Sequence, residues 1–148
     1  MTVPTLREVS ATTNRAESEA GWEPWSAARV AELAAAGKPV FVEFTAAWCV
    51  TCQVNRRMTL GRPELRADFE KRGVVLLRAD WTRRDSSITA ELTRLGRSGV
   101  PVYALYAPGV TEPRLMSEIL SVSEVRESID RLPAVPAART VASAAKEP

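Results

Sequence analysis

An apolar segment that runs directly into a pair of cysteines constrains the fold of this chain more than any other feature. Residues 39–46, PVFVEFTA, are almost continuously hydrophobic and rich in Val and Phe. Such a run is typical of a strand covered on both faces, as in the middle of an α/β sheet. Cys49 and Cys52, the only two cysteines of the chain, come next, and the pattern over residues 50–60 indicates a helix. The sequence therefore predicts a strand, a short turn and a helix whose first turn carries both thiols.

The rest of the chain alternates between helical and strand-like segments. Helices are predicted within residues 25–39, 63–73, 84–99 and 121–132, and strands within residues 74–81, 100–109 and 113–120. Suitable N-cap residues precede three of these helices: Ser26, then Asp85 or Ser86, then Ser121 or Ser123. Alternating helices and buried strands indicate an α/β fold, and the two adjacent strands before the last helix predict an antiparallel edge.

A CxxC pair that follows a central strand and opens a helix narrows the prediction to a thioredoxin-like fold. This is an α/β fold with a central mixed β-sheet flanked by helices. The length of 148 residues suits one domain, which we expect over residues 21–132. The polar residues 1–20 are expected to form a flexible lead-in, and the Pro- and Ala-rich residues 133–148 a disordered tail.

Composition excludes several classes of function. The chain has no histidine, which excludes Ser-His-Asp and Cys-His catalysis as well as histidine metal ligands. Two thiols alone leave zinc short of ligands, so no metal site is predicted. The net charge of +2 is carried by arginines scattered among acids, which indicates no nucleic-acid partner. No membrane-spanning run or secretory signal is recognised. A cytosolic protein and a domain cut from a longer exported chain both remain open.

The two cysteines are predicted to exchange disulfides. Cys49 at the helix start lies where free backbone N–H groups and the helix dipole favour a thiolate, so it is the expected attacking group. Cys52, one turn inside the helix, is expected to be shielded and to resolve a mixed disulfide by attacking Cys49. A purely structural disulfide is the alternative, but a bridge across two residues closes a tiny loop and stabilises little.

Other residues near the cysteines have two interpretations each. Glu43, in the predicted central strand, is costly to bury and would serve as proton acceptor for Cys52; a glutamate at a sheet edge is the alternative. Trp48 either flanks the site and limits solvent there or packs into the core. Pro101 opens a strand after a glycine-containing turn, and the residues alone indicate no more than a loop proline.

Residues farther from the thiols are given structural roles. Trp22 and Trp25 are expected to hold the first helix against the sheet, and Trp81 to end a strand near the site. Arg83 and Arg84 are expected in a solvated loop before the helix cap at Asp85.

Three segments together resemble the C-terminal thioredoxin-like domain of the DsbD family, and most closely its ScsB-like branch. They are GKPVFVEFTAAWCVTCQVN (residues 37–55), RADWTRRDSSIT (residues 78–89) and GRSGVPVYALY (residues 96–106). The resemblance extends over about residues 22–131. Because it rests on several segments in order, it is more specific than a CxxC pair alone.

The resemblance implies a periplasmic domain of an inner-membrane protein. Such a domain takes electrons from the transmembrane part of its parent protein and passes them to periplasmic thiol-disulfide proteins. It implies a monomeric domain with no cofactor other than its redox-active disulfide.

The resemblance also implies a role for each site residue. Cys49 would be the nucleophile, Cys52 the resolving thiol and Glu43 the buried acid. Pro101 would be a cis-proline, and Val100 would offer its backbone to a docked partner strand. Trp48 would contribute to binding the partner beside the thiols.

This chain departs from the family's usual pattern in three places. Relatives commonly have an acid where this chain has Ala47, and often a lysine where it has Gln53. Many have a second acid in the stretch occupied here by Asn55, Arg56 and Arg57, which leaves proton handling to Glu43. The two arginines are expected to stabilise the Cys49 thiolate and to make the domain somewhat more oxidising.

Three alternatives to a membrane-coupled reductase stay open. The first is a free-standing thioredoxin-like oxidoreductase or isomerase, which differs in the direction of electron flow. The second is a binding module whose CxxC pair carries copper(I), since thiolates suit soft metals. The third is an interaction domain with vestigial thiols.

Overall fold

The computed structural model describes residues 21–133, which contain a five-stranded mixed sheet with the strand order β1-β3-β2-β4-β5. The strands are β1 (Trp22–Pro24), β2 (Val40–Thr45), β3 (Val75–Asp80), β4 (Val102–Tyr106) and β5 (Arg114–Leu115). β1 and β2 run parallel to β3, whereas β4 is antiparallel to both β2 and β5. The predicted mixed sheet with an antiparallel edge is confirmed.

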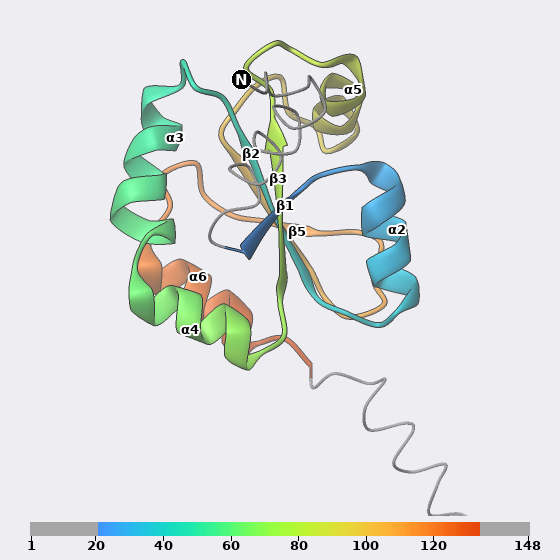
Figure 1. Cartoon of the computed structure of the whole chain (residues 1–148), viewed down its shortest axis with the longest axis vertical. Helices are drawn as coiled ribbons and strands as arrows, with labels where there is room; N and C mark the ends of the chain where they lie inside the picture. The colour runs from blue at the N-terminus through green and yellow to red at the C-terminus, as the bar shows by residue number, and fades with distance from the viewer. Residues whose placement is uncertain (1–20, 134–148) are drawn as a thin grey trace, which may run out of the picture.

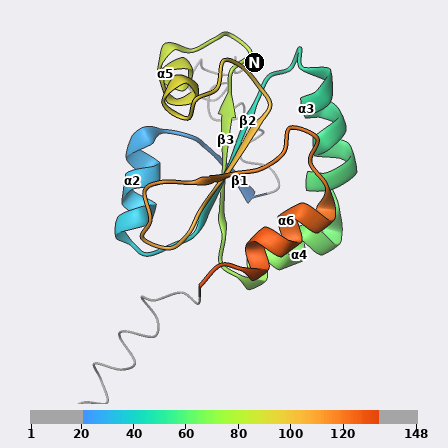
Figure 2. The same ribbon diagram turned by 180° about the vertical axis from the view of Figure 1, so that it is seen from behind.

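Helices cover both faces of this sheet (Figures 1 and 2). They are α2 (Ala27–Ala35), α3 (Val50–Asn55), the π-helix η2 (Arg56–Leu60), α4 (Pro63–Lys71), α5 (Ser86–Arg94) and α6 (Val122–Asp130). In both views α2 and α5 lie on one side of the sheet, and α3, α4 and α6 lie on the other. The sheet therefore separates two apolar cores.

Strand β2 lies in the middle of the sheet, and all six of its residues are buried. Val42 and Phe44 pack into the core beneath α2 and α5, while Phe41 packs into the core beneath α4 and α6. Because both faces of β2 are covered, its sequence is a continuous apolar run rather than an alternating pattern. The strand ends at Thr45, four residues before Cys49, which places the cysteines at its carboxyl end.

The predicted helix caps are confirmed. The Ser26 hydroxyl accepts a hydrogen bond from the Arg29 N–H at 3.0 Å, and the Ser121 hydroxyl accepts one from Glu124 at 3.1 Å. At α5 the cap is Asp85, whose carboxylate accepts from the N–H groups of Ser87 and Ile88. These side chains satisfy donors that the first turn of a helix leaves free.

The first strand was not predicted from the sequence. Trp22 belongs to β1 and lies at 6.1 Å, ring centroid to ring centroid, from Phe41, in the core on the α4 and α6 side. The prediction that Trp22 holds the first helix is therefore wrong. Trp25 does so, because it packs against Phe44 and the core that includes Leu33 of α2. Three residues carry too little periodicity to be recognised as a strand, and β1 forms through its pairing with β3.

The predictions for the lead-in at residues 1–20 and for the tail concern residues outside the described range, apart from residue 133. Within residues 21–133, no helix has the length and hydrophobicity needed to cross a bilayer.

Candidate active site

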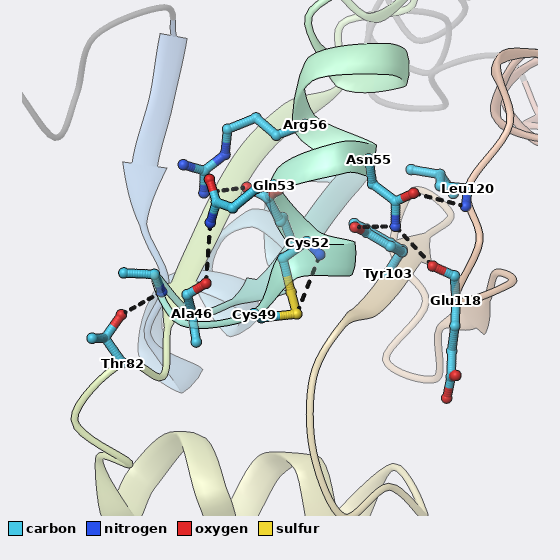
Figure 3. The surroundings of a disulfide bond; sticks show 12 residues. Ala46, Cys49, Cys52, Gln53, Asn55, Arg56, Thr82, Tyr103, Glu118 and Leu120 are labelled. Carbon is cyan, nitrogen blue, oxygen red and sulfur yellow. Dashed lines mark hydrogen bonds and ion pairs between the residues drawn. A yellow bond between two sulfur atoms is a disulfide. The ribbon is translucent and has the colours of Figure 1, made fainter.

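The two cysteines form a disulfide at the start of α3 (Figure 3). Cys49 is the N-cap of this helix, and its Sγ accepts a hydrogen bond from the Cys52 N–H at 3.2 Å. The exposed fraction is 8% for Cys49 and 0% for Cys52. An N–H donor and the helix dipole both favour negative charge on Cys49 Sγ once the bond is reduced. The arrangement gives the two sulfurs unequal access to a partner.

The disulfide packs against the loop before β4. Ala46, Cys49 and Cys52 form a small buried cluster against which the half-buried Val100 packs. The Val100–Pro101 peptide bond is cis, as the resemblance implies, and Pro101 is buried. Val100 precedes the first paired residue of β4, so it lies beside the sulfurs but outside the sheet.

Glu43 lies in the middle of β2 and is fully buried, which rules out an edge position open to water. Its Oε1 is 2.7 Å from Nε of Arg78, the paired residue on β3, and 3.5 Å from Nη2 of Arg56. Its other oxygen, Oε2, has no hydrogen-bond partner among the described residues. Two guanidinium groups thus compensate the charge of a carboxylate on the α3 side of the sheet.

These contacts correct one prediction. Arg56 was expected to stabilise the Cys49 thiolate, but its guanidinium is directed to Glu43. Arg57 is exposed and belongs to η2, the turn after α3. The pairing of Arg78 with Glu43 had no signal in the sequence, because it depends on the register between β2 and β3.

Asn55 at the end of α3 connects the site to the opposite edge of the sheet (Figure 3). Its Nδ2 donates to the Tyr103 hydroxyl at 2.9 Å and to the Glu118 carbonyl at 2.7 Å, and its Oδ1 accepts from the Leu120 N–H at 3.2 Å. Burial raises the pKa of Tyr103 to about 12, although the hydrogen bond from Asn55 acts in the opposite direction. Sequence reasoning missed this role because Asn55 was considered only as the replacement of an acid.

Trp48 is held beside the disulfide by the loop after β3. Its exposed fraction is 49%, its Nε1 donates to the Thr82 carbonyl at 3.0 Å, and its ring centroid lies 5.9 Å from that of Trp81. The guanidinium carbon of Arg84 lies 5.1 Å from the centroids of both rings. Trp48 therefore flanks the site instead of packing into the core. Arg84 lies in an exposed loop before the Asp85 cap, as predicted, and its side chain also contacts two aromatic rings.

A cavity of about 460 Å³ lies between the start of α3 and the ends of β1 and β3. Its lining includes Thr45, Gln53, Arg56 and Arg78. Thr45 Oγ1 and Arg56 Nε are buried there without a hydrogen-bond partner among the described residues. The cavity is therefore partly lined by polar groups and adjoins the two arginines that pair with Glu43.

Within residues 21–133, no group of three or more Cys, His, Asp or Glu side chains is arranged to hold a metal ion. The reactive groups that the structure brings to this site are the two sulfurs of Cys49 and Cys52, with the buried carboxylate of Glu43 on the α3 side of the sheet.

Comparison with known proteins places this arrangement in a family. A family model described as Thioredoxin-like matches residues 21–108. The chain belongs to the thioredoxin-like family. This agrees with the observed α/β fold and confirms the fold predicted from the sequence.

Among curated proteins, the thioredoxin-like chain is similar to two DsbD proteins. It is 35% identical over 85 residues to "Thiol:disulfide interchange protein DsbD 1" of Pseudomonas aeruginosa, a match that covers 57% of this chain and 14% of the relative. It is 36% identical over 72 residues to "Thiol:disulfide interchange protein DsbD" of Cronobacter sakazakii, a match that covers 49% of this chain and 12% of the relative. The chain thus spans only about a seventh or less of these relatives, and it is a DsbD-like thioredoxin-fold domain. Its place in the ScsB-like branch stays a prediction.

Solved structures give the same fold. The oxidised C-terminal domain of Neisseria meningitidis DsbD matches with a TM-score of 0.53 at 19% identity, over 90% of this chain and 100% of that one. A thioredoxin from Thermus thermophilus matches with a TM-score of 0.60 at 21% identity, over 74% of this chain and 84% of that one. At these identities the matches support the fold alone.

Proposed function

We propose that this thioredoxin-like chain is a protein-disulfide reductase domain working through Cys49-Val50-Thr51-Cys52. It would take electrons from a transmembrane part of its parent protein and pass them to thiol-disulfide proteins of the periplasm. The observation that supports this most directly is the disulfide at the start of α3, in which Cys49 keeps an exposed fraction of 8% and Cys52 is fully buried. The similarity to DsbD proteins supports the direction of electron flow and the compartment.

The reaction consists of two thiol-disulfide exchanges. In the reduced domain, the Cys49 thiolate attacks a partner disulfide; one S–S bond breaks, a mixed disulfide forms, and the first partner sulfur leaves as a thiolate. Cys52 then loses its proton and attacks Cys49 Sγ. This attack forms the Cys49–Cys52 bond and releases the second partner thiolate. Two electrons pass to the partner. The Cys52 proton is released, and the two partner thiolates take up protons from solvent.

Glu43 is the proposed acceptor for the Cys52 proton. It is fully buried on the α3 side of the sheet, and its Oε2 is free of hydrogen bonds among the described residues. The adjoining cavity, lined by polar side chains, offers the proton a route away from the carboxylate. The ion pairs with Arg56 and Arg78 would position the carboxylate in this task.

The partner is proposed to dock across the cis-proline loop and Trp48. The backbone of Val100 lies beside the sulfurs and outside the paired part of β4, so an extended partner segment can hydrogen-bond there. Pro101 in this loop is buried, and Trp48, which directly precedes Cys49, is half exposed. Such docking would present a partner sulfur to Cys49.

Trapping with Cys52→Ser tests the proposed function. Without its resolving thiol the protein should retain partners as mixed disulfides through Cys49, detectable on non-reducing gels and identifiable by mass spectrometry. Cys49→Ser is the matched control and should retain none. Failure of the Cys52→Ser variant to form a mixed disulfide with an abundant disulfide-containing partner would contradict the relay.

Equilibration with glutathione determines the direction of flow. A reduction potential well below that of the glutathione couple is expected for a reductase. A potential near the strongly oxidising end would instead assign the chain to the free-standing oxidases.

A further inference from the structure

An exposed apolar strip continues from the disulfide along the outer side of α3 and η2. It consists of Val50, Val54 and Met58, called the α3 strip, whose exposed fractions are 76%, 51% and 65%. Their spacing of four residues places them on one face of the helix. Together with Ala47, Gln53 and Arg57 they line a shallow cavity of about 370 Å³.

The strip is continuous with the sulfur site. Val50 directly follows Cys49 in the first turn of α3, and Ala47 borders the cavity from the turn before it. The Ala47 N–H donates to the Thr82 hydroxyl at 2.9 Å, in the same loop that holds Trp48. Because Trp48 and Val50 flank Cys49 in the chain, a partner whose sulfur reaches Cys49 would lie near both Trp48 and the α3 strip.

Two arginines lie beside these apolar groups, one at the α3 strip and one at Trp48. Arg57 lines the cavity of the strip, and Arg84 lies against the Trp48 ring. Both side chains are exposed, and neither forms an ion pair with a carboxylate of residues 21–133. Two guanidinium groups without a described acidic partner can pair with carboxylates brought by another molecule.

The acids of the neighbouring loop are engaged within that loop. Asp80 accepts hydrogen bonds from the N–H and hydroxyl of Thr82, and Asp85 caps α5. Arg84 stands between them with a φ of 54°, a backbone conformation that is unfavourable for a residue with a side chain. The fold thus keeps an arginine over Trp48 at a conformational cost, although Arg84 forms no ion pair within the described chain.

We propose that the partner segment carrying the reactive cysteine has acidic residues on both sides of an apolar contact. The apolar side chain would cover the α3 strip, and the carboxylates would pair with Arg57 and Arg84. This inference rests on the proposed function and specifies the chemistry of the partner that the same site accepts.

Three synthetic peptide disulfides test the inference with the reduced full-length chain. Each contains the same apolar residues around one cysteine, and the flanking residues are aspartate, lysine or glycine. We measure the second-order rate of exchange at low and at high salt. The aspartate peptide should react about tenfold faster than the lysine peptide at low salt, and the ratio should fall towards one as salt screens the charges.

Charge reversal supplies the second comparison. The Arg57→Glu/Arg84→Glu variant should lose or invert the preference for aspartate over lysine. Lys38→Glu is the control for position, because it reverses one charge at an exposed site before β2, at the end of the sheet away from the cysteines. Its ratio should equal that of the unaltered chain. Since each comparison is a ratio within one variant, a change in sulfur reactivity cancels.

The outcomes separate this inference from the proposed function. Exchange with all three peptides at equal rates would overturn the inference and leave the reductase proposal standing. No exchange with any peptide would overturn the reductase proposal, and the inference with it. Self-association that is lost in Val54→Ser, or binding to phosphatidylglycerol vesicles that is lost in Arg57→Glu, would assign the strip to another occupant and overturn the inference.

Discussion

Glu43 is the buried acidic residue around which the charged groups of the interior are arranged. A fully buried charge is costly to remove from water, and two guanidinium groups compensate this cost here. The closer one, Arg78, also lies over the Trp22 ring with its guanidinium carbon 4.6 Å from the centroid. Arg78 therefore contacts both the buried carboxylate of β2 and the buried Trp22 ring of the edge strand β1.

Replacing Arg78 should reveal this dependence. We expect Arg78→Met to lower the free energy of unfolding by about 3 kcal/mol, because Glu43 keeps only the more distant Arg56. Urea unfolding at neutral pH measures the change. Arg62→Met removes an exposed pair with Glu64 and should cost no more than about 0.5 kcal/mol. Equal losses in the two variants would contradict the role given to Arg78.

Glu43→Leu in the Arg78→Met background provides a further check on the same residue pair. Removing the carboxylate removes the uncompensated charge, so the double variant should be more stable than Arg78→Met alone. A double variant that is less stable would show that Glu43 still stabilises the fold without Arg78, through packing or its pair with Arg56, and would contradict an uncompensated charge as the cause of the loss.

Among the elements, α5 depends on a single charged cap. Hydrogen bonds from the Ser87 side chain and from the Ile88 N–H lower the pKa of Asp85 below its ordinary value. The same helix holds Trp81, because the Trp81 Nε1 donates a hydrogen bond to the Thr89 hydroxyl at 2.8 Å. The cap therefore stabilises the helix that supports the loop beside Trp48.

Because the cap is a carboxylate, we expect its contribution to the stability of the folded chain to depend on pH. Because the folded pKa of Asp85 is lowered, its contribution is complete above the ordinary aspartate value of about 4 and disappears as the pH falls through the folded value. Asp85→Ala should therefore melt at a lower temperature than the unaltered chain at neutral pH, and the gap should narrow in strong acid. Glu70→Ala, an exposed carboxylate on α4, is the control. A gap that stays constant with pH would refute the charged cap.

At the scale of the whole molecule, the two tyrosines report on both cores. Tyr103 and Tyr106 are the only tyrosines of the chain, and they lie in the cores on opposite faces of β4. Burial raises the pKa of each to about 12. Both phenols thus stay neutral as long as the sheet and its two helical layers hold together.

An alkaline titration tests the integrity of both layers. Since the folded pKa values are raised, the tyrosines contribute full stability below the unfolded value of about 10, and this contribution is lost as the pH rises towards 12. Phenolate absorbance should therefore appear near pH 12 in the native chain and near pH 10 in concentrated urea. Circular dichroism should show unfolding over the same alkaline range. A native titration near pH 10 for either tyrosine would contradict its burial.

Several features followed from the amino-acid sequence alone because they depend on local chemistry. The apolar run of β2, the caps at Ser26 and Asp85, and the placement of Cys49 at a helix start are each set by neighbouring residues. Periodicity and capping act within a few residues, so their patterns can be recognised without the fold.

Other features were decided only by the tertiary structure, because they join residues that are distant in the chain. Arg78 meets Glu43 through the register of two parallel strands, and Asn55 meets Tyr103 across the core. Strand β1 exists because β3 offers it an edge, and Arg84 covers Trp48 because a loop folds back on the first turn of α3. Ion pairs, hydrogen bonds between distant residues and strand pairing depend on the three-dimensional approach of groups. No local pattern encodes that approach.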